Sequence, residues 1–200
     1  MYVFHYGAEY HYREGHENPS MDEYMRRHTA GMQVPNPNYF RRSKAQVDTA
    51  IAIFGLDAGT SVRYGDVTQV NGGGEHAPRD EYQRRVLATR DAVVSEFKSH
   101  APSVAIIAGS EAFLAFRKIL DPALGEHRPS VVVRMRNPGS QGHRGATAEA
   151  WNAAYANAAA SLANSCGAVL GLAGSTRYFA LRSNRPVGGV VPLFRIVEEP

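Results

Sequence analysis

The feature that most constrains the fold is the segment from residue 101 to residue 144. Residues 103–108 form a short run of mostly apolar, β-branched side chains, which is typical of a strand buried on both faces. A glycine and a serine interrupt this run, and residues 111–120 continue with apolar side chains at helical spacing. A second apolar run at 131–133 ends shortly before Asn137. Buried strand, helix and buried strand in succession predict an open parallel sheet, whose ligands bind beyond the carboxyl ends of its strands.

The rest of the chain largely continues this alternation. Further strands are predicted at residues 2–6, 62–70, 176–182 and 190–197, and helices near 21–28 and at 44–54, 78–100 and 147–164. Ser43 and Gly55 are the expected caps of the helix at 44–54, and the last two strands are expected to form a hairpin. We therefore expect one α/β domain over residues 1–200, with three α/β/α layers around a mostly parallel sheet. Its core would span residues 1–165, and a C-terminal β extension would span 168–200.

Composition excludes several classes of protein. No apolar run approaches the roughly 20 residues that a membrane-spanning helix needs, and the first residues lack the basic and apolar regions of a signal peptide. We therefore expect a cytoplasmic protein with no membrane partner. Cys166 is the only cysteine among the 200 residues, which excludes internal disulfides, a four-cysteine zinc site and a cysteine-ligated iron–sulfur cluster. No metal-ligand spacing is present, so we expect no metal and no cofactor.

The charge of the chain leaves two interpretations open. Its formal net charge is +3, and its isoelectric point is near 9.1. The basic residues form small groups at predicted loops and strand ends: Arg41, Arg42 and Lys44; Arg84 and Arg85; Arg134 and Arg136; His143 and Arg144. These groups indicate either a polyanionic partner or ordinary solvated surface charge.

Polar residues follow the predicted parallel strands at the points where the strands end. They are residues 7–11, Asn71, Gly109 with Ser110, and residues 137–140. Because the carboxyl ends of parallel strands meet at one side of a sheet, these segments are expected to converge on one small ligand. Together they offer a carboxylate, two amides, aromatic rings and backbone N–H groups beside glycines.

These segments resemble the motifs of the uracil-DNA glycosylase superfamily. Residues 7–11, Gly-Ala-Glu-Tyr-His, resemble its Gly-Gln-Asp-Pro-Tyr-His motif, one residue shorter and without the proline. Phe40 ahead of a helix, Asn71 at a strand end and the passage 97–113 resemble the motifs that follow. Asn137-Pro138-Gly139-Ser140 is similar to its last motif, His-Pro-Ser or Asn-Pro-Ser, with one inserted glycine. The resemblance covers roughly residues 2–162, and its departures put plain uracil specificity in question. The cysteine content excludes the iron–sulfur branches of the superfamily.

The resemblance implies a monofunctional DNA glycosylase that hydrolyses the N-glycosidic bond of a pyrimidine flipped out of DNA. Glu9 would stabilise the sugar cation and orient water, and Asn137 would bind the negative charge that develops on the departing base. The resemblance further implies contacts with the base from Tyr10, Phe40, Asn71 and Ser140, and contacts with DNA from Arg41, Arg42, His143 and Arg144. The long segment 10–38 and the glycines at 72–74 leave room for a modified pyrimidine, oxidised or hypermodified as in phage DNA. A role in phage defence is one expectation.

Each of these assignments has an alternative. Glu9 could be a solvated strand-end carboxylate, Asn71 and Asn137 could be turn formers, and Phe40 could belong to the core. The protein as a whole could be a catalytically silent DNA-binding module or an N-glycosidase acting on free nucleosides or nucleotides. We expect a monomer.

Overall fold

A computed structural model describes residues 1–5, 20–34, 36–68, 78–139, 145–171 and 175–200. Its centre is a six-stranded sheet with the order β2-β1-β3-β4-β5-β6. The strands are β1 (Tyr2–His5), β2 (Arg63–Asp66), β3 (Val104–Ala108), β4 (Val131–Met135), β5 (Arg177–Arg182) and β6 (Arg195–Glu199). All neighbouring pairs are parallel except β5 with β6, which is antiparallel.

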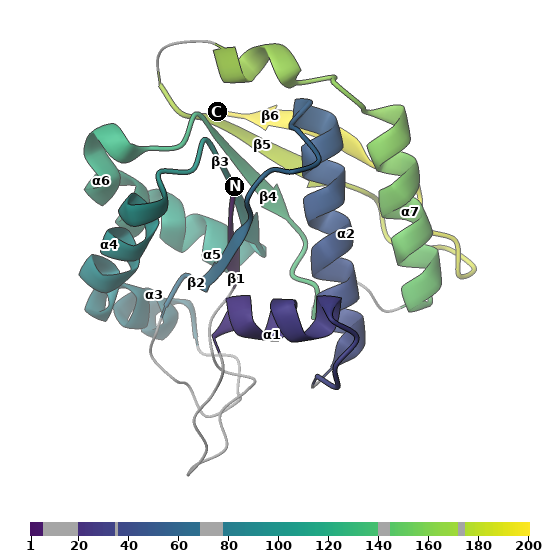
Figure 1. Cartoon of the computed structure of the whole chain (residues 1–200), viewed down its shortest axis with the longest axis horizontal. Helices are drawn as coiled ribbons and strands as arrows, with labels where there is room; N and C mark the ends of the chain where they lie inside the picture. The colour runs from purple at the N-terminus through teal and green to yellow at the C-terminus, as the bar shows by residue number, and fades with distance from the viewer. Residues whose placement is uncertain (6–19, 35, 69–77, 140–144, 172–174) are drawn as a thin grey trace.

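Helices cover both faces of this sheet, so the predicted three-layer α/β/α fold is confirmed (Figure 1). The α-helices are α1 (Met21–Thr29), α2 (Pro37–Phe54), α3 (Arg79–Ala88), α4 (Arg90–His100), α5 (Ser110–Ala115), α6 (Asp121–Leu124) and α7 (Ala148–Ser161). The π-helical turn η2 (Phe116–Leu120) and the 3-10 turns η3 (Gly125–His127) and η5 (Gly167–Gly171) complete the helical residues. Helices α2 and α7 pack on one face, and α3 to α6 pack on the other (Figure 1).

Alternation along the strands divides the apolar side chains between two cores. Tyr2 and Phe4 of β1 face α3, α4 and α5, whereas Val3 between them faces α2 and α7. The central strands β3 and β4 contribute to both cores, which is why their sequences read as nearly continuous apolar runs.

Helix α2 begins seven residues before the predicted start, so the prediction that Ser43 caps it was wrong. Asn36 is the N-cap, its Oδ1 accepting from the Tyr39 N–H at 3.3 Å, and Pro37 occupies the first helical position. Ser43 lies inside the helix and is fully buried. The predicted end at Gly55 is confirmed, because this glycine closes the helix with φ +62°.

On the face covered by α3 to α6, the helical segments predicted at 78–100 and 111–120 are both interrupted. The predicted helix at 78–100 is two helices, because Thr89 at φ −110° and ψ 8° leaves the helical region. Its predicted apolar stripe of Tyr82, Val86, Val93 and Phe97 is nevertheless buried. Between α5 and α6 the chain forms the π-helical turn η2. We attribute this turn to Pro122, which has no N–H to donate to the preceding turn.

The strands at the two sides of the sheet differ most from prediction. Strand β2 ends at Asp66, although it was predicted to continue to residue 70. The C-terminal hairpin is confirmed, but its second strand begins at Arg195, five residues later than expected. Because β5 pairs in parallel with β4, the hairpin continues the main sheet.

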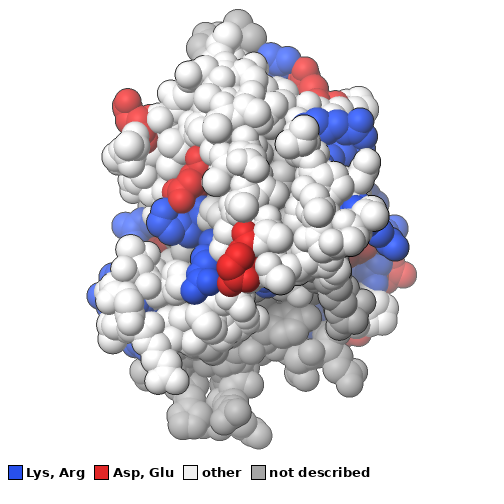
Figure 2. All heavy atoms as spheres, turned by 90° about the vertical axis from the view of Figure 1, so that its right-hand side faces the viewer, with Lys and Arg blue, Asp and Glu red and all other residues white. Residues whose placement is uncertain are grey.

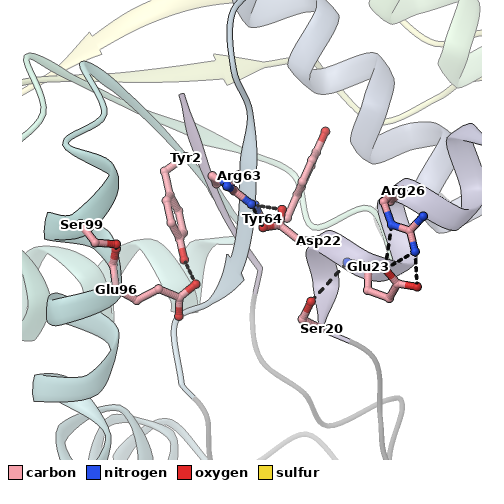
Figure 3. Close-up of polar contacts among 9 residues, drawn as sticks. All are labelled: Tyr2, Ser20, Asp22, Glu23, Arg26, Arg63, Tyr64, Glu96 and Ser99. Atoms are coloured by element: carbon pink, nitrogen blue, oxygen red, sulfur yellow. Dashed lines mark hydrogen bonds and ion pairs between the residues drawn. The ribbon is translucent and has the colours of Figure 1, made fainter.

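Helix α1 lies against the outer edge of β2 (Figure 3). Ser20 caps the helix by accepting from the Glu23 N–H at 3.2 Å. Asp22 accepts from the Tyr64 N–H at 2.7 Å and contacts the Arg63 guanidinium at 3.3 Å. One helical carboxylate therefore binds a backbone donor of the outermost strand. Within the described ranges, no helix has the length and apolar character needed to cross a membrane.

Candidate functional site

The strand order locates the crevice in which a ligand is most readily held. The connection from β1 to β2 includes α2 on one face of the sheet, and the connection from β3 to β4 includes α5 on the opposite face. In sheets of order 2-1-3-4-5, ligands bind at this reversal, beyond the carboxyl ends of the first and third strands. Among the described residues, Gly109 follows β3 at this position, and Asn137 follows the neighbouring strand β4.

Gly109 and Asn137 lie against each other at the carboxyl end of the sheet. The Gly109 N–H donates to the Met135 carbonyl at 2.8 Å, which extends the pairing of β3 with β4 beyond both strands. Gly109 has φ +112°, and a Cβ at this position would lie 3.4 Å from the Asn137 Cβ. This backbone conformation favours glycine and allows α5 to begin directly at the end of the strand.

The side chain of Asn137 organises its own turn. Its Oδ1 accepts from the Gly139 N–H at 2.8 Å, which is the hydrogen bond of an Asx turn. Among the described residues, its Nδ2 group has no acceptor within hydrogen-bond distance. The amide oxygen is therefore used by the protein, whereas no described residue accepts from the amide N–H donors.

Helix α2 holds the backbone on both sides of Asn137. The Gln46 Nε2 group donates to the Arg136 carbonyl at 2.7 Å and to the Tyr155 hydroxyl at 2.9 Å. The Arg42 Nε group donates to the Pro138 carbonyl at 2.7 Å. Partial burial lowers the pKa of Arg42. Arg42, which was predicted to contact DNA, is thus engaged within the protein and fixes the turn.

The aromatic side chain at this turn is Tyr39 rather than the predicted Phe40. The Phe40 ring is fully buried between α1 and α2, with ring centroids 5.7 Å from Tyr24 and 5.4 Å from Tyr39. Of the two alternatives for Phe40, the structure shows the core residue. Tyr39 is half-buried, and a Cβ at Gly139 would lie 3.3 Å from its ring. The missed sequence signal was Asn36-Pro37. It starts α2 early and places Tyr39 within the first turn of the helix.

A cleft of about 440 Å³ opens beside Asn137, beyond the ends of β3, β4 and β5. It is lined by Gly109, Ser110, Glu111, Arg134, Met135, Arg136, Asn137, Ala180, Leu181, Arg182 and Ser183. We call it the arginine cleft. The Arg136 guanidinium donates to the Ser183 carbonyl at 2.9 Å and lies 5.3 Å from the Trp151 ring centroid. Sequence grouping had identified Arg134 and Arg136 but not Arg182, which comes from the C-terminal hairpin.

At the opposite edge of the sheet, around β2, three carboxylates lie near one another. Asp66 ends β2, and Glu96 of α4 accepts from the Tyr2 hydroxyl at 2.7 Å (Figure 3). Burial raises the pKa of Tyr2, and so do its hydrogen bond to Glu96 and the negative charges of Glu96, Asp22 and Asp66. We call Asp22, Asp66 and Glu96 the acidic corner. Burial, and then the charge of Glu96, raise the pKa of Asp66 to about 7.

Sequence reasoning missed Asp66 as a site residue because it placed the residue inside a strand. Aspartate is disfavoured in strands, and this preference was the available signal that β2 ends there. A carboxyl group with a pKa near neutrality at the carboxyl end of a sheet has the properties of a general acid or base.

Most of the remaining predicted site residues lie outside the described ranges: Glu9, Tyr10, Asn71, Ser140, His143 and Arg144. Their roles remain predictions. Arg41 lies on the exposed face of α2, 3.8 Å from Glu149. Within the described ranges, no group of three or more His, Cys, Asp or Glu side chains could hold a metal ion.

The site thus combines a fixed amide donor, an aromatic ring and an arginine-lined cleft. No protein-family model, curated protein or solved structure matches the chain. Its function must therefore be argued from the site itself.

Proposed function

We propose that the protein is a monofunctional DNA glycosylase that hydrolyses the N-glycosidic bond of a modified pyrimidine flipped out of DNA. The observation that carries this proposal is the Asn137 turn. Its amide follows β4, the strand next to the reversal between β1 and β3, and the backbone around it is held by Gln46, Arg42 and Gly109. The motif resemblance at the same residues adds independent support.

The proposed chemistry needs a donor of this kind. When an N-glycosidic bond breaks, the sugar becomes positive and the departing base becomes negative. A donor that is fixed before the reaction stabilises such a developing anion without reorganising, and removing one donor of this type costs about 3–4 kcal/mol. Because Oδ1 of Asn137 is bound to Gly139, the amide cannot rotate freely, and its N–H groups keep one orientation.

The proposal also needs a carboxylate near the sugar. Asp66 is separated from β4 by β1 and β3, so three strand spacings, roughly 14 Å, lie between Asp66 and the Asn137 turn. This distance is too large for both groups to act on one glycosidic bond. Glu9, which follows β1 in the sequence and lies outside the described residues, is therefore our proposed catalytic carboxylate.

The volume of the arginine cleft fits a substrate larger than uracil. About 440 Å³ lies within the range of pockets that enclose small organic ligands, so it leaves room for a substituent on the pyrimidine ring. We therefore propose a modified base, as in some phage DNA, and a role in phage defence. We further propose a cytoplasmic monomer.

Base release from a panel of modified DNAs tests this proposal. Oligonucleotides carrying uracil, oxidised pyrimidines or hypermodified pyrimidines are incubated with the protein, and the released bases are identified by mass spectrometry. We expect release of at least one modified pyrimidine and alkali-labile abasic sites. The Asn137→Asp variant is the control, because it keeps the turn acceptor and removes the donors. Absence of base release from every substrate would contradict the proposal.

The arginine cleft also favours a second candidate, an N-glycosidase for free nucleotides, because guanidinium groups suit phosphate monoesters. Competition separates the two activities. An enzyme acting on DNA should ignore free nucleotides and lose affinity for its substrate steeply with salt. A catalytically silent DNA-binding module would bind DNA with the same salt dependence and release nothing.

A further inference from the structure

Two arginines of the cleft share one carboxylate oxygen. Arg134 of β4 and Arg182 at the end of β5 both donate through Nη2 to Oε1 of Glu199 on β6. The side chain of Glu199 is only 11% exposed, whereas that of Arg182 is 48% exposed. A buried anion therefore fixes two guanidinium groups side by side, and the side chain of one of them is about half exposed to solvent.

The local charges leave an excess of positive charge in the cleft. Arg134, Arg136 and Arg182 line it, and Glu199 neutralises one of these charges. Glu111 also lines the cleft, but its carboxylate pairs with Arg79 at 3.2 Å. The described charged groups at the cleft are thus four arginines and two glutamates.

Hydrogen-bond donors remain after these pairs are formed. A guanidinium carries five N–H donors. Arg134 uses Nη2 for Glu199 and has only a long contact, 3.5 Å, from Nη1 to the Ser110 hydroxyl. The Oγ atom of Ser183 is buried and has no hydrogen-bond partner among the described residues. The cleft therefore presents unused donors from the Ser110 hydroxyl and from the guanidinium groups of Arg134 and Arg182, a set that matches the oxygens of a phosphate group.

The arginine cleft lies next to the Asn137 turn, where we propose that the base binds. Arg134 pairs with Ala180 across β4 and β5, so Arg182 and Ser183 follow beside Arg136 and Asn137. Adjacent strands are about 5 Å apart. A group bound by Arg182 therefore lies one strand spacing from the proposed base-binding amide, as a phosphate next to a flipped nucleotide would.

We infer that Arg134 and Arg182, held by Glu199, bind a backbone phosphate of the DNA strand adjacent to the flipped nucleotide. This inference rests on the proposed function in its choice of DNA as the source of the phosphate. Glu199 has two opposed effects in this arrangement. It positions the arginines, and its negative charge weakens their attraction for the phosphate.

The test measures the affinity for a short duplex with one abasic-site analogue at salt concentrations from about 50 to 200 mM. Arg134→Gln and Arg182→Gln should each weaken binding about 3- to 10-fold. Each should also reduce the slope of log affinity against log salt by about 0.9, the value for one phosphate contact. Glu199→Gln should bind about 2- to 5-fold more tightly, because it removes a negative charge from the cleft.

Arg177→Gln is the matched control. Arg177 lies at the other end of β5 and pairs with Glu198 of β6 at 2.6 Å, so the same kind of ion pair is lost far from the cleft. This variant should keep the affinity and the slope of the wild type within about 2-fold. If Arg182→Gln and Glu199→Gln change affinity in the same direction and in proportion to their loss of melting temperature, both residues are structural and the inference fails.

Binding of deoxythymidine monophosphate by calorimetry distinguishes the source of the phosphate. Loss of this binding in Arg182→Gln, with duplex affinity and slope unchanged, would overturn the assignment to DNA. An unchanged slope with no monophosphate binding would overturn the phosphate site itself. If the slope falls as expected but no DNA substrate releases a base, the inference holds and the proposed glycosylase activity fails.

Discussion

The two sides of the carboxyl end of this sheet carry opposite charge. Beyond β4 and β5 lies the arginine cleft, with three arginines along its wall. Beyond β2 lies the acidic corner, where burial and Glu96 hold the pKa of Asp66 near 7. Asn137 lies beside the first region, and roughly 14 Å of sheet separates it from the second. An anionic ligand would therefore be attracted to the arginine cleft and disfavoured at the acidic corner.

Net charge does not reveal this arrangement. A value of +3 over 200 residues is modest, and much of it is balanced locally by pairs such as Lys44 with Asp48 at 2.7 Å. On the face shown in Figure 2, the basic side chains lie in separate groups, several of them beside acidic ones. What distinguishes the arginine cleft is an excess of arginine where strands end, since most of the other pairs are exposed and contribute little.

The largest expected effect compares two carboxylates, Glu9 and Asp66. Glu9→Gln should reduce single-turnover base release by about 10³-fold or more while DNA affinity stays nearly unchanged, because the sugar cation loses its stabilising charge. Asp66→Asn should keep the rate within about 3-fold, because Asp66 is too far from Asn137. The opposite ranking of the two variants would move the reaction to the acidic corner.

A smaller loss of activity is expected from replacing Asn137, which lies beside the arginine cleft. Asn137→Ala should lower the single-turnover rate about 10²-fold or more with little change in the dissociation constant for DNA, because the donor acts on charge present only in the transition state.

Asn137→Asp separates the two roles of this side chain. It retains an acceptor for the Gly139 N–H and replaces the amide donors with a negative charge. Activity in Asn137→Asp close to that of the wild type would show that only the turn matters. We expect instead that it is at least as impaired as Asn137→Ala.

Asn71 has a distinct expected role, although it lies outside the described residues. If it reads the edge of the base, Asn71→Asp should change the ratio of rates on two competing modified substrates more than it changes binding of an abasic duplex. Competition between two labelled substrates in one reaction measures this ratio. An unchanged ratio would remove Asn71 from base selection.

The ionisation of Asp66 should be visible in the pH dependence of the free energy of unfolding. Its folded pKa of about 7 lies above the ordinary value of 3.8, so the folded state binds more protons than the unfolded state between these pH values. Its contribution to stability is therefore fully present below about pH 4 and is lost as pH rises to about 7. Asp66→Asn should remove this loss and exceed the wild type above pH 7 by about 2–4 kcal/mol in unfolding free energy. Urea unfolding at pH 4.5 and pH 8 measures it, and equal stability differences at both pH values would contradict the shift.

The smallest expected effect concerns Asp22, the member of the acidic corner on α1. Asp22→Ala should lower the free energy of unfolding by about 1–2 kcal/mol, because it leaves the Tyr64 N–H without its acceptor. Glu23→Ala is the control, since this neighbour forms only exposed pairs with Arg26 and Arg27 worth less than about 1 kcal/mol. Equal losses in the two variants would show that the backbone contact adds nothing.

Sequence patterns predicted the layers of this fold because apolar periodicity reports burial directly. The runs at 103–108 and 131–133 became β3 and β4, and the stripe on α3 and α4 is buried as predicted. Element ends were less predictable, because they depend on single contacts. Asn36 with Pro37 began α2 earlier than Ser43, and a bend at Val67 ended β2 at Asp66.

The site could be predicted in part for a related reason. Asn137 follows the buried strand β4 and Gly109 follows the buried strand β3, so the topology alone brings them together. Arg182 could not be assigned to the same site, because sequence patterns did not show that β5 joins β4 in parallel. The roles of Arg42 and Tyr39 depended on where α2 begins, and a shift of seven residues reassigned both.

The contact between Asp22 and Tyr64 also has a consequence for how copies of the chain meet one another. An outermost strand with unpaired backbone groups is a template on which another chain can add a strand, and this is a route to aggregation. Helix α1 covers one side of the sheet with a carboxylate already bound to a backbone donor of β2. The other side ends in β6, whose exposed Arg195 and Glu198 place charge along the strand. Both borders of the sheet thus discourage polymerisation, one by occupation of the backbone and the other by charge.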